Sequence, residues 1–419
     1  MDEKLKKVRA ILKKYHQEHL LAFYTDLNEN EKTILSDQIL KIDFDFILNL
    51  YHHALDTDKS VADIISPLPY YIKTQMPKRK YQILTRIGEN VISNHHFAAI
   101  TLAGGQGTRL GFKGPKGTFE LDIEPKKSLF EILCDQLKRA NYKYHTTIPW
   151  YIMTSSENYL DTIAYFKNKN FFDYPQDEIY FFKQGKLPLI DLNGKLILEE
   201  TYKIKEASNG NGNVFYSLAQ SGLFGNMKEK DIRYVSVTGV DNIICEMVDP
   251  LFIGLSVFEQ VLVSSKTLFK KDPTSNQWVF GLKDGKPAII DCRNFGEQLS
   301  AIQDANGNYL YREINILCHL FHIDALEKLA TVSLPYHLAF RKNAFVNEEG
   351  MKQVPDEANT YKFETFIFDA FSHFDKIALL RVEEDDEFAP IKDFNGPHNP
   401  EVAKELYEKK LKIDNKTEL

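Results

Sequence analysis

The sequence has few of the features that mark membrane, secreted or disulfide-bonded proteins. None of its apolar runs approaches the ~20 residues that a membrane-spanning helix needs. Its opening run, MDEKLKKVRAILKKY, is charged throughout and lacks the apolar core of a signal peptide. The 4 cysteines have no paired spacing, which favours reduced thiols over a disulfide framework. We therefore expect a cytoplasmic protein.

An excess of positive charge is also missing. The formal net charge is -7, which argues against nucleic acid or an anionic membrane as a partner, because both reward broad basic surfaces. Any anion that this protein binds must be held by a local group of cations. The length of 419 residues is enough for two or three domains.

One glycine-rich stretch, LAGGQGTRLGFKGPKG at residues 102–117, is typical of a loop that holds phosphates. An apolar run at 97–102 precedes it and predicts a buried strand. The loop has three early glycines, Gly104, Gly105 and Gly107. Glycine permits φ values and close approaches that a Cβ forbids, so main-chain N–H groups can face an anion. Arg109 and Lys116 add positive charge, and the composition fits a nucleoside triphosphate.

The better-known phosphate loops do not match this stretch. A Walker A loop requires Gly, four residues and then Gly-Lys-Ser/Thr, and no glycine here has that partner. A dinucleotide fingerprint requires GxGxxG, but after Gly105 and Gly107 the sixth position is Leu110, and Gly111 comes one residue late. The motif belongs to another class.

The strings LAGGQGTRLG and GPKG resemble the signature of the UDP-sugar pyrophosphorylase family, most closely its UDP-N-acetylglucosamine pyrophosphorylase branch. The string QEHLLAFYTDL near the N-terminus is also similar to that family. The resemblance implies a Rossmann-like, GT-A-like nucleotidyltransferase core with a mostly parallel sheet. Strands that alternate with helices after residue 95 independently predict such an α/β sheet.

We expect three consecutive domains: a helical layer at 1–94, the catalytic core at 95–385 and a small segment at 386–419. Apolar spacing predicts helices at 5–15, 17–24, 43–55, 128–140, 157–166, 214–223 and 399–412. Further strands are expected at 149–153, 179–182, 232–237, 363–369 and 377–382, with an antiparallel insertion at 260–310 that turns at Asp284-Gly285 and Asn306-Gly307. Ser128 with Glu131, and Asn399 with Pro400, are typical helix starts.

Three polar or glycine positions follow predicted strands by a few residues: Gly104, Gln184 and Asp241. Ligands of parallel α/β sheets bind beyond the carboxyl ends of the strands. We therefore expect these distant positions to meet at one edge of the sheet.

The resemblance assigns roles around UTP and a divalent cation. It implies that nucleotide is bound by Leu102, Ala103, Gly104, Gly105, Gln106, Gly107, Thr108, Gln184 and Gly210, with Gln184 on the uracil edge. It also implies that Asp241, in TGVDN, binds Mg²⁺ (or Mn²⁺), and that Arg109, Lys116 and Lys392 act on the phosphates. Mg²⁺ usually takes one or two carboxylates plus phosphate and water, which a single aspartate suits.

Sugar contacts are implied at Asn211, Asn315, Glu364, Phe366, Phe368 and His337. This half of the match is weaker than the phosphate half. The segment IIDCRNF, with Asp291, differs from the usual family pattern, as do Glu313-Ile314 before Asn315 and Asn213 after the GNG turn.

Several of these positions have a purely structural alternative. Asp241 can cap a turn at a strand end, and Phe366 and Phe368 can be core residues on alternate positions of a strand. Cys318, His319 and His322 are close enough for a metal site, but zinc sites usually present two separated ligand pairs. We favour a packed strand end for those three.

The predicted reaction joins UTP to a sugar 1-phosphate and releases pyrophosphate and a UDP-sugar. N-acetylglucosamine 1-phosphate is the favoured sugar, with glucose 1-phosphate and N-acetylgalactosamine 1-phosphate as alternatives. A regulator that binds nucleotide sugar without catalysis is a further alternative. The expected assembly is a monomer or a homodimer.

Overall fold

The computed structural model describes residues 3–55, 64–271, 278–291, 302–303, 307 and 309–417. The chain forms two compact units, each assembled from separate stretches of sequence. Unit 1 comprises Met1–Ala62, Gly185–Asn213 and Leu334–Phe366, and unit 2 comprises Asp63–Gln184, Val214–Ser333 and Ile367–Leu419. These units interleave along the chain, so they differ from the three consecutive domains expected at 1–94, 95–385 and 386–419.

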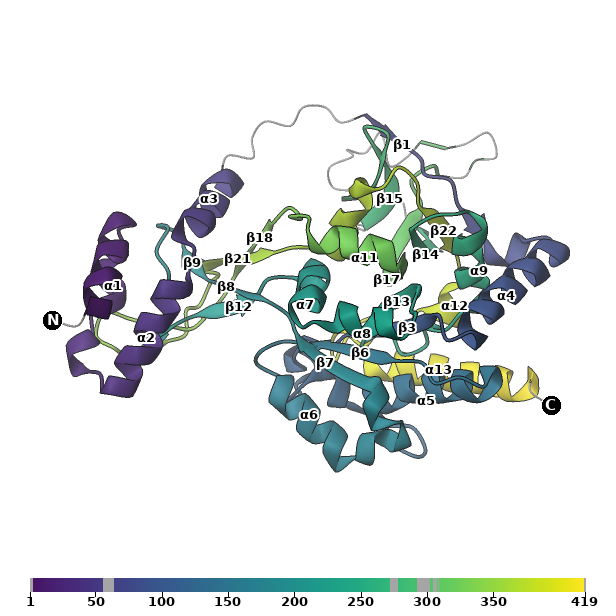
Figure 1. Ribbon diagram of the computed structural model, residues 1–419, viewed down its shortest axis with the longest axis horizontal. Coiled ribbons are helices and arrows are strands. Elements are labelled where there is room, and N and C mark those ends of the chain that lie inside the picture. Colours follow the sequence, from purple (N-terminus) through teal and green to yellow (C-terminus); the bar gives the residue numbers. More distant parts are fainter. Residues whose placement is uncertain are drawn as a thin grey trace. The chain divides into compact units, whose positions relative to one another are not determined.

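Unit 2 is built on an α/β sheet (Figure 1). Its main path is β2 (Tyr71–Ile72), β22 (Ala378–Arg381), β14 (Val263–Phe269), β17 (Glu313–His322), β13 (Tyr234–Gly239), β3 (Phe97–Leu102), β6 (Trp150–Thr154) and β7 (Ile179–Lys183). Strands β13, β3, β6 and β7 pair in parallel, as do β14 and β2 with β22. Strand β17 is antiparallel to β13 and β14. The mostly parallel α/β sheet predicted from the sequence is confirmed.

The central strands are mostly apolar, as is typical of parallel strands whose two faces are both covered. Every residue of β3 and β6 is buried. The unit contains α4 (Lys78–Ser93), α5 (Leu129–Tyr144), α6 (Tyr159–Asn168), α7 (Val214–Gln220), α8 (Leu223–Glu229), α9 (Pro250–Phe258), α11 (Ile323–Ala330), α12 (Glu384–Glu387) and α13 (Pro400–Thr417). In Figure 1, α5 and α6 lie below β6 and β7.

Both predicted helix starts are confirmed. Ser128 Oγ accepts a hydrogen bond from the Glu131 N–H at 3.2 Å, and Glu131 Oε2 accepts one from the Ser128 N–H at 2.7 Å. This reciprocal pair begins α5. At the start of α13, Asn399 Oδ1 accepts from the Val402 N–H at 3.0 Å. Each cap satisfies backbone donors that a helix end would otherwise leave unpaired.

The hairpin turn predicted at Asp284-Gly285 is confirmed. It joins β15 (Trp278–Lys283) to β16 (Lys286–Asp291), and Lys283 pairs with Lys286 across it. Both turn residues have positive φ, 50° and 76°, as a two-residue turn of this kind requires. Strand β15 also pairs with β1 (Ile65–Ser66). The other predicted turn includes Asn306, which lies outside the described residues.

Unit 1 combines helices with several short strand pairs. Its helices are α1 (Glu3–Lys14), α2 (Glu29–Lys41) and α3 (Phe44–Leu55), and its largest sheet is β18 (His337–Arg341), β21 (Thr360–Glu364) and β9 (Ile190–Asp191). The two-stranded pairs are β8 (Lys186–Pro188) with β12 (Glu206–Ser208), β10 (Leu198–Glu200) with β11 (Lys203–Ile204), and β19 (Phe345–Val346) with β20 (Lys352–Gln353). Helix residues such as Leu12 and Ile39 share a buried core with Ile190 and Phe363 of the strands.

Two predicted elements are wrong in part. The helix expected at 17–24 is replaced by short 3₁₀ turns at Glu18–Leu21 and Tyr24–Asp26, because His16 has a φ of 56° that ends α1. The strand expected at 363–369 ends at Glu364, opposite His337, the first residue of β18. The next N–H, that of Thr365, donates to Asn209 O instead of to a strand, and Ile367–His373 form a 3₁₀ helix.

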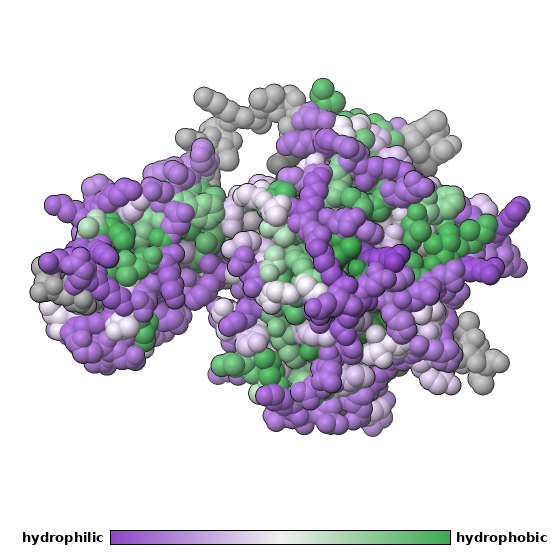
Figure 2. Space-filling view, in the orientation of Figure 1, coloured by the Kyte–Doolittle hydropathy of each residue, from purple (hydrophilic) through white to green (hydrophobic). Residues whose placement is uncertain are grey.

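Hydrophilic residues cover most of the face drawn in Figure 2, with smaller hydrophobic patches between them. Exposed large apolar side chains include Ile83 on α4 and Phe258 on α9. Among the described helices, none is long and apolar enough to cross a membrane.

Helices α4 and α9 cross at very short range because both carry glycine at the crossing. A Cβ on Gly254 would lie 1.8 Å from the Leu84 carbonyl oxygen, and one on Gly88 would lie 1.9 Å from that of Pro250. Backbone oxygens cannot move aside as a flexible side chain can. This crossing therefore admits no larger residue without separation of the two helices.

We predict that Gly254→Ala destabilises the protein by roughly 1–3 kcal/mol or more, through overpacking against backbone. Gly225→Ala in α8 is the matched control, because a Cβ there meets no atom within 4 Å. The control should be neutral or stabilise by up to about 1 kcal/mol, since alanine is the better helix former. Thermal unfolding of both variants measures this, and equal melting temperatures would contradict the close crossing.

Candidate functional site

The register of the parallel strands brings the predicted phosphate loop and Asp241 to one edge of the sheet in unit 2. Leu102, at the end of β3, pairs with Gly239 of β13 on one side and with Met153 of β6 on the other. The Val240 N–H donates to Leu102 O at 3.1 Å. The Gln184 N–H donates to Thr154 O at 2.7 Å, which extends β7 by one residue. The predicted meeting of Gly104, Gln184 and Asp241 at the carboxyl ends of the strands agrees with this register.

The glycine-rich loop folds back on itself. The Gly107 N–H donates to Gly114 O and the Lys116 N–H donates to Gly105 O, both at 3.0 Å. Short 3₁₀ turns follow at Thr108–Leu110 and Lys116–Thr118. These bonds hold Lys116 beside the first arm of the loop, although it lies eleven residues after Gly105 in sequence.

Two early glycines of the loop, Gly104 and Gly107, are required for close approach and not for positive φ. Gly107 has a φ of −79°, whereas positive φ occurs later, at Gly111 and Gly114. A Cβ on Gly104 would lie 2.7 Å from Gln184 Oε1, and one on Gly107 would lie 2.6 Å from the Phe112 ring. Of the two expected roles of glycine here, close approach is therefore the one that applies to Gly104 and Gly107. The missing Cβ at Gly104 lets the Gln184 side-chain amide lie against the Gly104 backbone.

Asn158 supports this loop and was missed by sequence reasoning. Its side chain is fully buried. Nδ2 donates to Ala103 O at 2.9 Å and to Gly105 O at 3.3 Å, while Oδ1 accepts from the Ser155 N–H at 2.8 Å. The side chain thus joins the ends of β3 and β6. In the sequence, Asn158 is marked only by its position at the start of the helix predicted at 157–166. That position is equally typical of an ordinary helix cap.

Lys116 and Asp241 form an ion pair with Nζ and Oδ2 3.2 Å apart. Their side chains are 12% and 24% exposed, so the pair is reachable from solvent but largely enclosed. A Cβ on Gly239 would lie 2.8 Å from Asp241 Oδ1, so glycine leaves the room that this carboxylate occupies. The predicted phosphate cation and the predicted metal ligand therefore neutralise one another here.

The segment that carries Lys392 crosses the same edge. The Ile391 N–H donates to Asp241 O at 3.0 Å, and Pro390 forms a bridge with Asn242. Directly after Lys392, the same segment contacts the glycine loop: Arg109 Nη1 lies 3.5 Å from Asp393 Oδ1, and the Phe394 N–H donates to Arg109 O at 3.1 Å. This segment therefore links the Asp241 turn to the glycine loop and brings the three predicted catalytic cations into one region.

The surroundings of Lys392 are partly aromatic. Its Nζ lies 5.9 Å from the centre of the Phe388 ring, and its N–H donates to His398 O at 2.9 Å. Burial lowers the pKa of His398, and the positive charge of Lys392 lowers it further. A neutral imidazole at this position adds no positive charge beside Lys392 at neutral pH.

Unit 1 assembles most of the predicted sugar-binding residues. Gly210 has a φ of 91°, and a Cβ there would lie 2.1 Å from Thr365 O. The Gly212 N–H donates to the same oxygen at 3.0 Å. The turn that carries Asn211 therefore packs on the end of β21. Glu364 pairs with His337 across the strands, and the His337 and Phe366 rings lie 5.0 Å apart. The altered residue Asn213 accepts from the Gly185 N–H at 2.8 Å.

The two remaining sugar candidates lie in unit 2. Asn315 is on β17, and its Oδ1 accepts from the Leu317 N–H at 2.9 Å, where Leu317 has a φ of 56°. The Phe368 ring packs 5.1 Å from that of Trp278.

One departure from the family pattern has a structural explanation. Glu313 is buried and forms an ion pair with Arg381, and it accepts a hydrogen bond from Thr267 Oγ1 at 2.6 Å. The unusual glutamate before Asn315 thus joins three strands of the sheet. The segment after Asp291, which includes Cys292, lies outside the described residues.

Neither metal-like cluster among the described residues is a convincing metal site. Cys318, His319 and His322 all lie on β17, where His319 Nδ1 is 2.5 Å from Ser265 Oγ. Burial lowers the pKa of His319 to about 3, so it is neutral. The preference for a packed strand is consistent with this placement. Cys134, Cys245 and Cys318 are buried and free.

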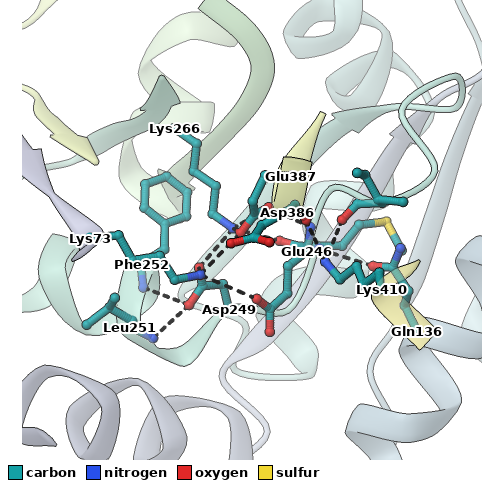
Figure 3. Close-up of polar contacts among 12 residues, drawn as sticks. Lys73, Gln136, Glu246, Asp249, Leu251, Phe252, Lys266, Asp386, Glu387 and Lys410 are labelled. Atoms are coloured by element: carbon teal, nitrogen blue, oxygen red, sulfur yellow. Dashed lines mark hydrogen bonds and ion pairs between the residues drawn. The ribbon is translucent and has the colours of Figure 1, made fainter. Parts of the chain in front are cut away.

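The second cluster consists of Glu246, Asp249 and Glu387. A lysine already fills it, because Lys266 Nζ lies 2.8 Å from Asp249 Oδ2 and 2.9 Å from Glu387 Oε1 (Figure 3). Burial raises the pKa of the Asp249 and Glu387 carboxyl groups, but the ammonium groups of Lys266 and Lys73 outweigh it and hold each pKa below its ordinary value. The carboxylates of Asp249 and Glu387 are therefore charged, and lysine is their counter-ion.

Comparison with known proteins adds a family to this geometry. A family model described as UTP–glucose-1-phosphate uridylyltransferase matches residues 47–397. UDP-N-acetylglucosamine diphosphorylase 1 of Arabidopsis thaliana is 32% identical over 416 residues, 94% of this chain and 81% of that protein. UDP-N-acetylglucosamine pyrophosphorylase of Saccharomyces cerevisiae is 32% identical over 368 residues, 84% of this chain and 77% of that protein.

A solved structure is similar over nearly the whole chain. It is the uridine diphosphate N-acetylglucosamine pyrophosphorylase from Trypanosoma brucei in complex with inhibitor. Its TM-score is 0.81 at 26% identity, and the match covers 97% of this chain and 84% of that chain. The similarity therefore includes both units.

Asn158→Ala is predicted to weaken UTP binding by about tenfold or more, because loss of one buried hydrogen-bonding partner costs roughly 1–3 kcal/mol and 1.4 kcal/mol is tenfold in affinity. Titration calorimetry with UTP measures the effect. Asn141→Ala is the control, since Asn141 holds Tyr174 and Ile148 in the same unit through similar bonds. Equal losses of affinity in the two variants would show that Asn158 acts only through general stability.

Proposed function

The chain belongs to the UTP–glucose-1-phosphate uridylyltransferase family, and from this we propose that it joins UTP to N-acetylglucosamine 1-phosphate and releases pyrophosphate. The observation that carries the proposal is the shared edge where the glycine loop, the Lys116–Asp241 pair and the Lys392 segment meet. Relatives named for UDP-N-acetylglucosamine synthesis support the choice of sugar. We also place the protein in the cytoplasm, where its free cysteines would stay reduced.

In the proposed reaction, an oxygen of the sugar 1-phosphate attacks the α-phosphorus of UTP in line, and pyrophosphate leaves. Such phosphoryl transfer asks the protein mainly for positioning and charge stabilisation, so no side-chain nucleophile is needed. The loop from Leu102 to Thr108, with Arg109, holds the triphosphate. Lys116 stabilises charge on the leaving pyrophosphate, and Lys392 steadies the attacking phosphate.

The uracil base of UTP is recognised beside the glycine-rich loop. A glutamine side chain can pair with an N–H and a carbonyl of uracil, because it offers both donors and an acceptor. The closeness of Gln184 Oε1 to Gly104 supports a uracil that lies flat against the Gly104 backbone. A side chain at position 104 would displace the amide that makes this contact.

Asp241 is the residue that would hold Mg²⁺ or Mn²⁺. A single carboxylate at the strand end, in the space that Gly239 leaves, fits an ion that takes its other ligands from phosphate and water. Such an ion supplies positive charge that offsets the charge developing on the phosphates. The competing carboxylate cluster is neutralised by Lys266, so Asp241 is the better candidate.

Sugar selection is assigned to the residues gathered in unit 1, above all Asn211, Glu364 and His337. Their side chains supply donors and acceptors for sugar hydroxyl or N-acetyl groups. Glucose 1-phosphate is retained as a second candidate because the matching family description names it.

The test of function is pyrophosphate release from UTP with three sugar 1-phosphates: those of N-acetylglucosamine, N-acetylgalactosamine and glucose. We expect the first to give the highest kcat/KM, and we expect removal of Mg²⁺ by a chelator to abolish turnover. Clean UTP binding without turnover on any sugar would indicate a non-catalytic regulator. Turnover that is unchanged by chelation would contradict the metal role of Asp241.

Lys116→Ala is predicted to lower kcat by roughly 10²-fold or more, by analogy with removal of a preorganised charge-stabilising donor. Lys113→Ala is the matched control, because Lys113 is an exposed lysine of the same loop. Steady-state kinetics of both variants with UTP in excess measure the effect. Near-normal turnover in the Lys116 variant would remove this side chain from the mechanism.

A further inference from the structure

Two segments that are far apart in sequence are fastened together behind the proposed phosphate site. We name them the 241–249 turn, which begins with Asp241, and the 387–394 strap, which carries Lys392. Asn242 Nδ2 donates to Glu387 O, and Asn242 Oδ1 accepts from the Ala389 N–H, each at 2.9 Å. The position of Lys392 relative to Asp241 is therefore set by the start of the strap.

The side chain of Glu387 makes the deepest of these connections. It is 1% exposed, and its Oε2 accepts from the Glu246 N–H at 2.9 Å. Its Oε1 lies 2.9 Å from Lys266 Nζ and 3.4 Å from Lys73 Nζ. One carboxylate thus contacts the 241–249 turn, β14 and the stretch before α4 (Figure 3).

A carboxylate buried to this extent has a large desolvation cost unless cations and hydrogen-bond donors compensate it. Lys266, with no exposed side-chain surface, is its main partner and is shared with Asp249. Because buried ion pairs often contribute little net stability, this pair needs another explanation than stability alone. Such buried ion pairs are better suited to holding two segments in a fixed relative position.

Other side chains hold the same two segments from the opposite side. Lys410 of α13 donates to Ile244 O, in the 241–249 turn, at 2.7 Å. It also donates at 3.0 Å to Asp386 O, directly before the 387–394 strap. Gln136 of α5 donates to Ile243 O at 2.9 Å. The 241–249 turn is therefore held from α5 and α13 as well as from β14 and the 387–394 strap.

We propose that Glu387 is a positioning residue for the reaction: held by Lys266, its carboxylate fixes the 387–394 strap so that Lys392 faces the phosphates beside Asp241 and Lys116. The proposal rests on the proposed function, since it names what orients Lys392 in that site. Asp249 provides an internal comparison. It shares Lys266 and is also buried, but its carboxylate caps α9 at Leu251 and Phe252 instead of contacting the strap.

The first experiment measures the strap without reference to activity. Hydrogen exchange is followed by mass spectrometry in the wild type, Glu387→Gln and Asp249→Asn. We expect Glu387→Gln to speed exchange of the Ala389 and Ile391 amides by about tenfold or more, since local opening becomes easier. Asp249→Asn should leave those amides protected. Unchanged exchange in Glu387→Gln, or equal exposure in both variants, would overturn the proposal.

The second experiment asks whether Glu387 acts through Lys392. In the wild-type background, Glu387→Gln should lower kcat/KM for the sugar 1-phosphate about 10- to 100-fold, as small misplacements of a reacting group do. In the Lys392→Ala background the same change should cost less than about twofold, because coupled residues are not additive. An equal factor in the two backgrounds would overturn the proposal.

Lys410→Met provides a second variant should Glu387→Gln fail to fold, because Lys410 lies nearer the surface and keeps the buried cluster intact. It should give the same pattern of amide exchange at Ala389 and Ile391, and full protection there would count against the strap. Absence of wild-type turnover on every sugar would reject the proposed function, and the exchange result would still decide whether Glu387 fixes the strap.

Discussion

The parallel pairing of β3 with β13 is the constraint on which the candidate site depends. Its register sets Leu102 opposite Gly239, so that the glycine loop and the Asp241 turn leave the sheet side by side. Residues more than a hundred positions apart in sequence thereby lie close together at the strand ends, and no long loop is needed to connect them. A shift of this register by one residue would move side chains to the other face of the sheet, and full burial of β3 makes that shift costly.

Charge is distributed in a way that suits an acidic protein with an anionic ligand. The chain carries a net charge of -7, yet Arg109, Lys116 and Lys392 lie in segments that meet at one edge of the sheet. Lys116 is paired with Asp241, and Arg109 is paired with Asp393. If a triphosphate and its cation bind as proposed, they would replace these partners, and neither Lys116 nor Asp241 would be left without an opposite charge.

Local features of the fold were predictable from the sequence, and long-range ones were only partly so. The capping pair Ser128 and Glu131 and the Asp284-Gly285 turn are short-range chemistry, and both are present as predicted. The edge shared by Gly104, Gln184 and Asp241 followed from strand topology. Asn158 and Glu387 were not predictable, because each is defined by contacts with carbonyls or cations distant in sequence. The strand expected through Phe368 failed because its partner β18 begins at His337, opposite Glu364.

The same distinction explains why the phosphate residues match the family better than the sugar residues do. The predicted phosphate contacts use main-chain amides and strand ends, whose positions the sheet fixes whatever the neighbouring side chains are. The predicted sugar contacts depend instead on individual side chains. Glu313 illustrates the point, since it is unusual for the family but is buried against Arg381 and Thr267, where it joins strands next to Asn315. A change that stabilises the sheet can therefore adjust an adjacent sugar contact while the phosphate edge stays as it is.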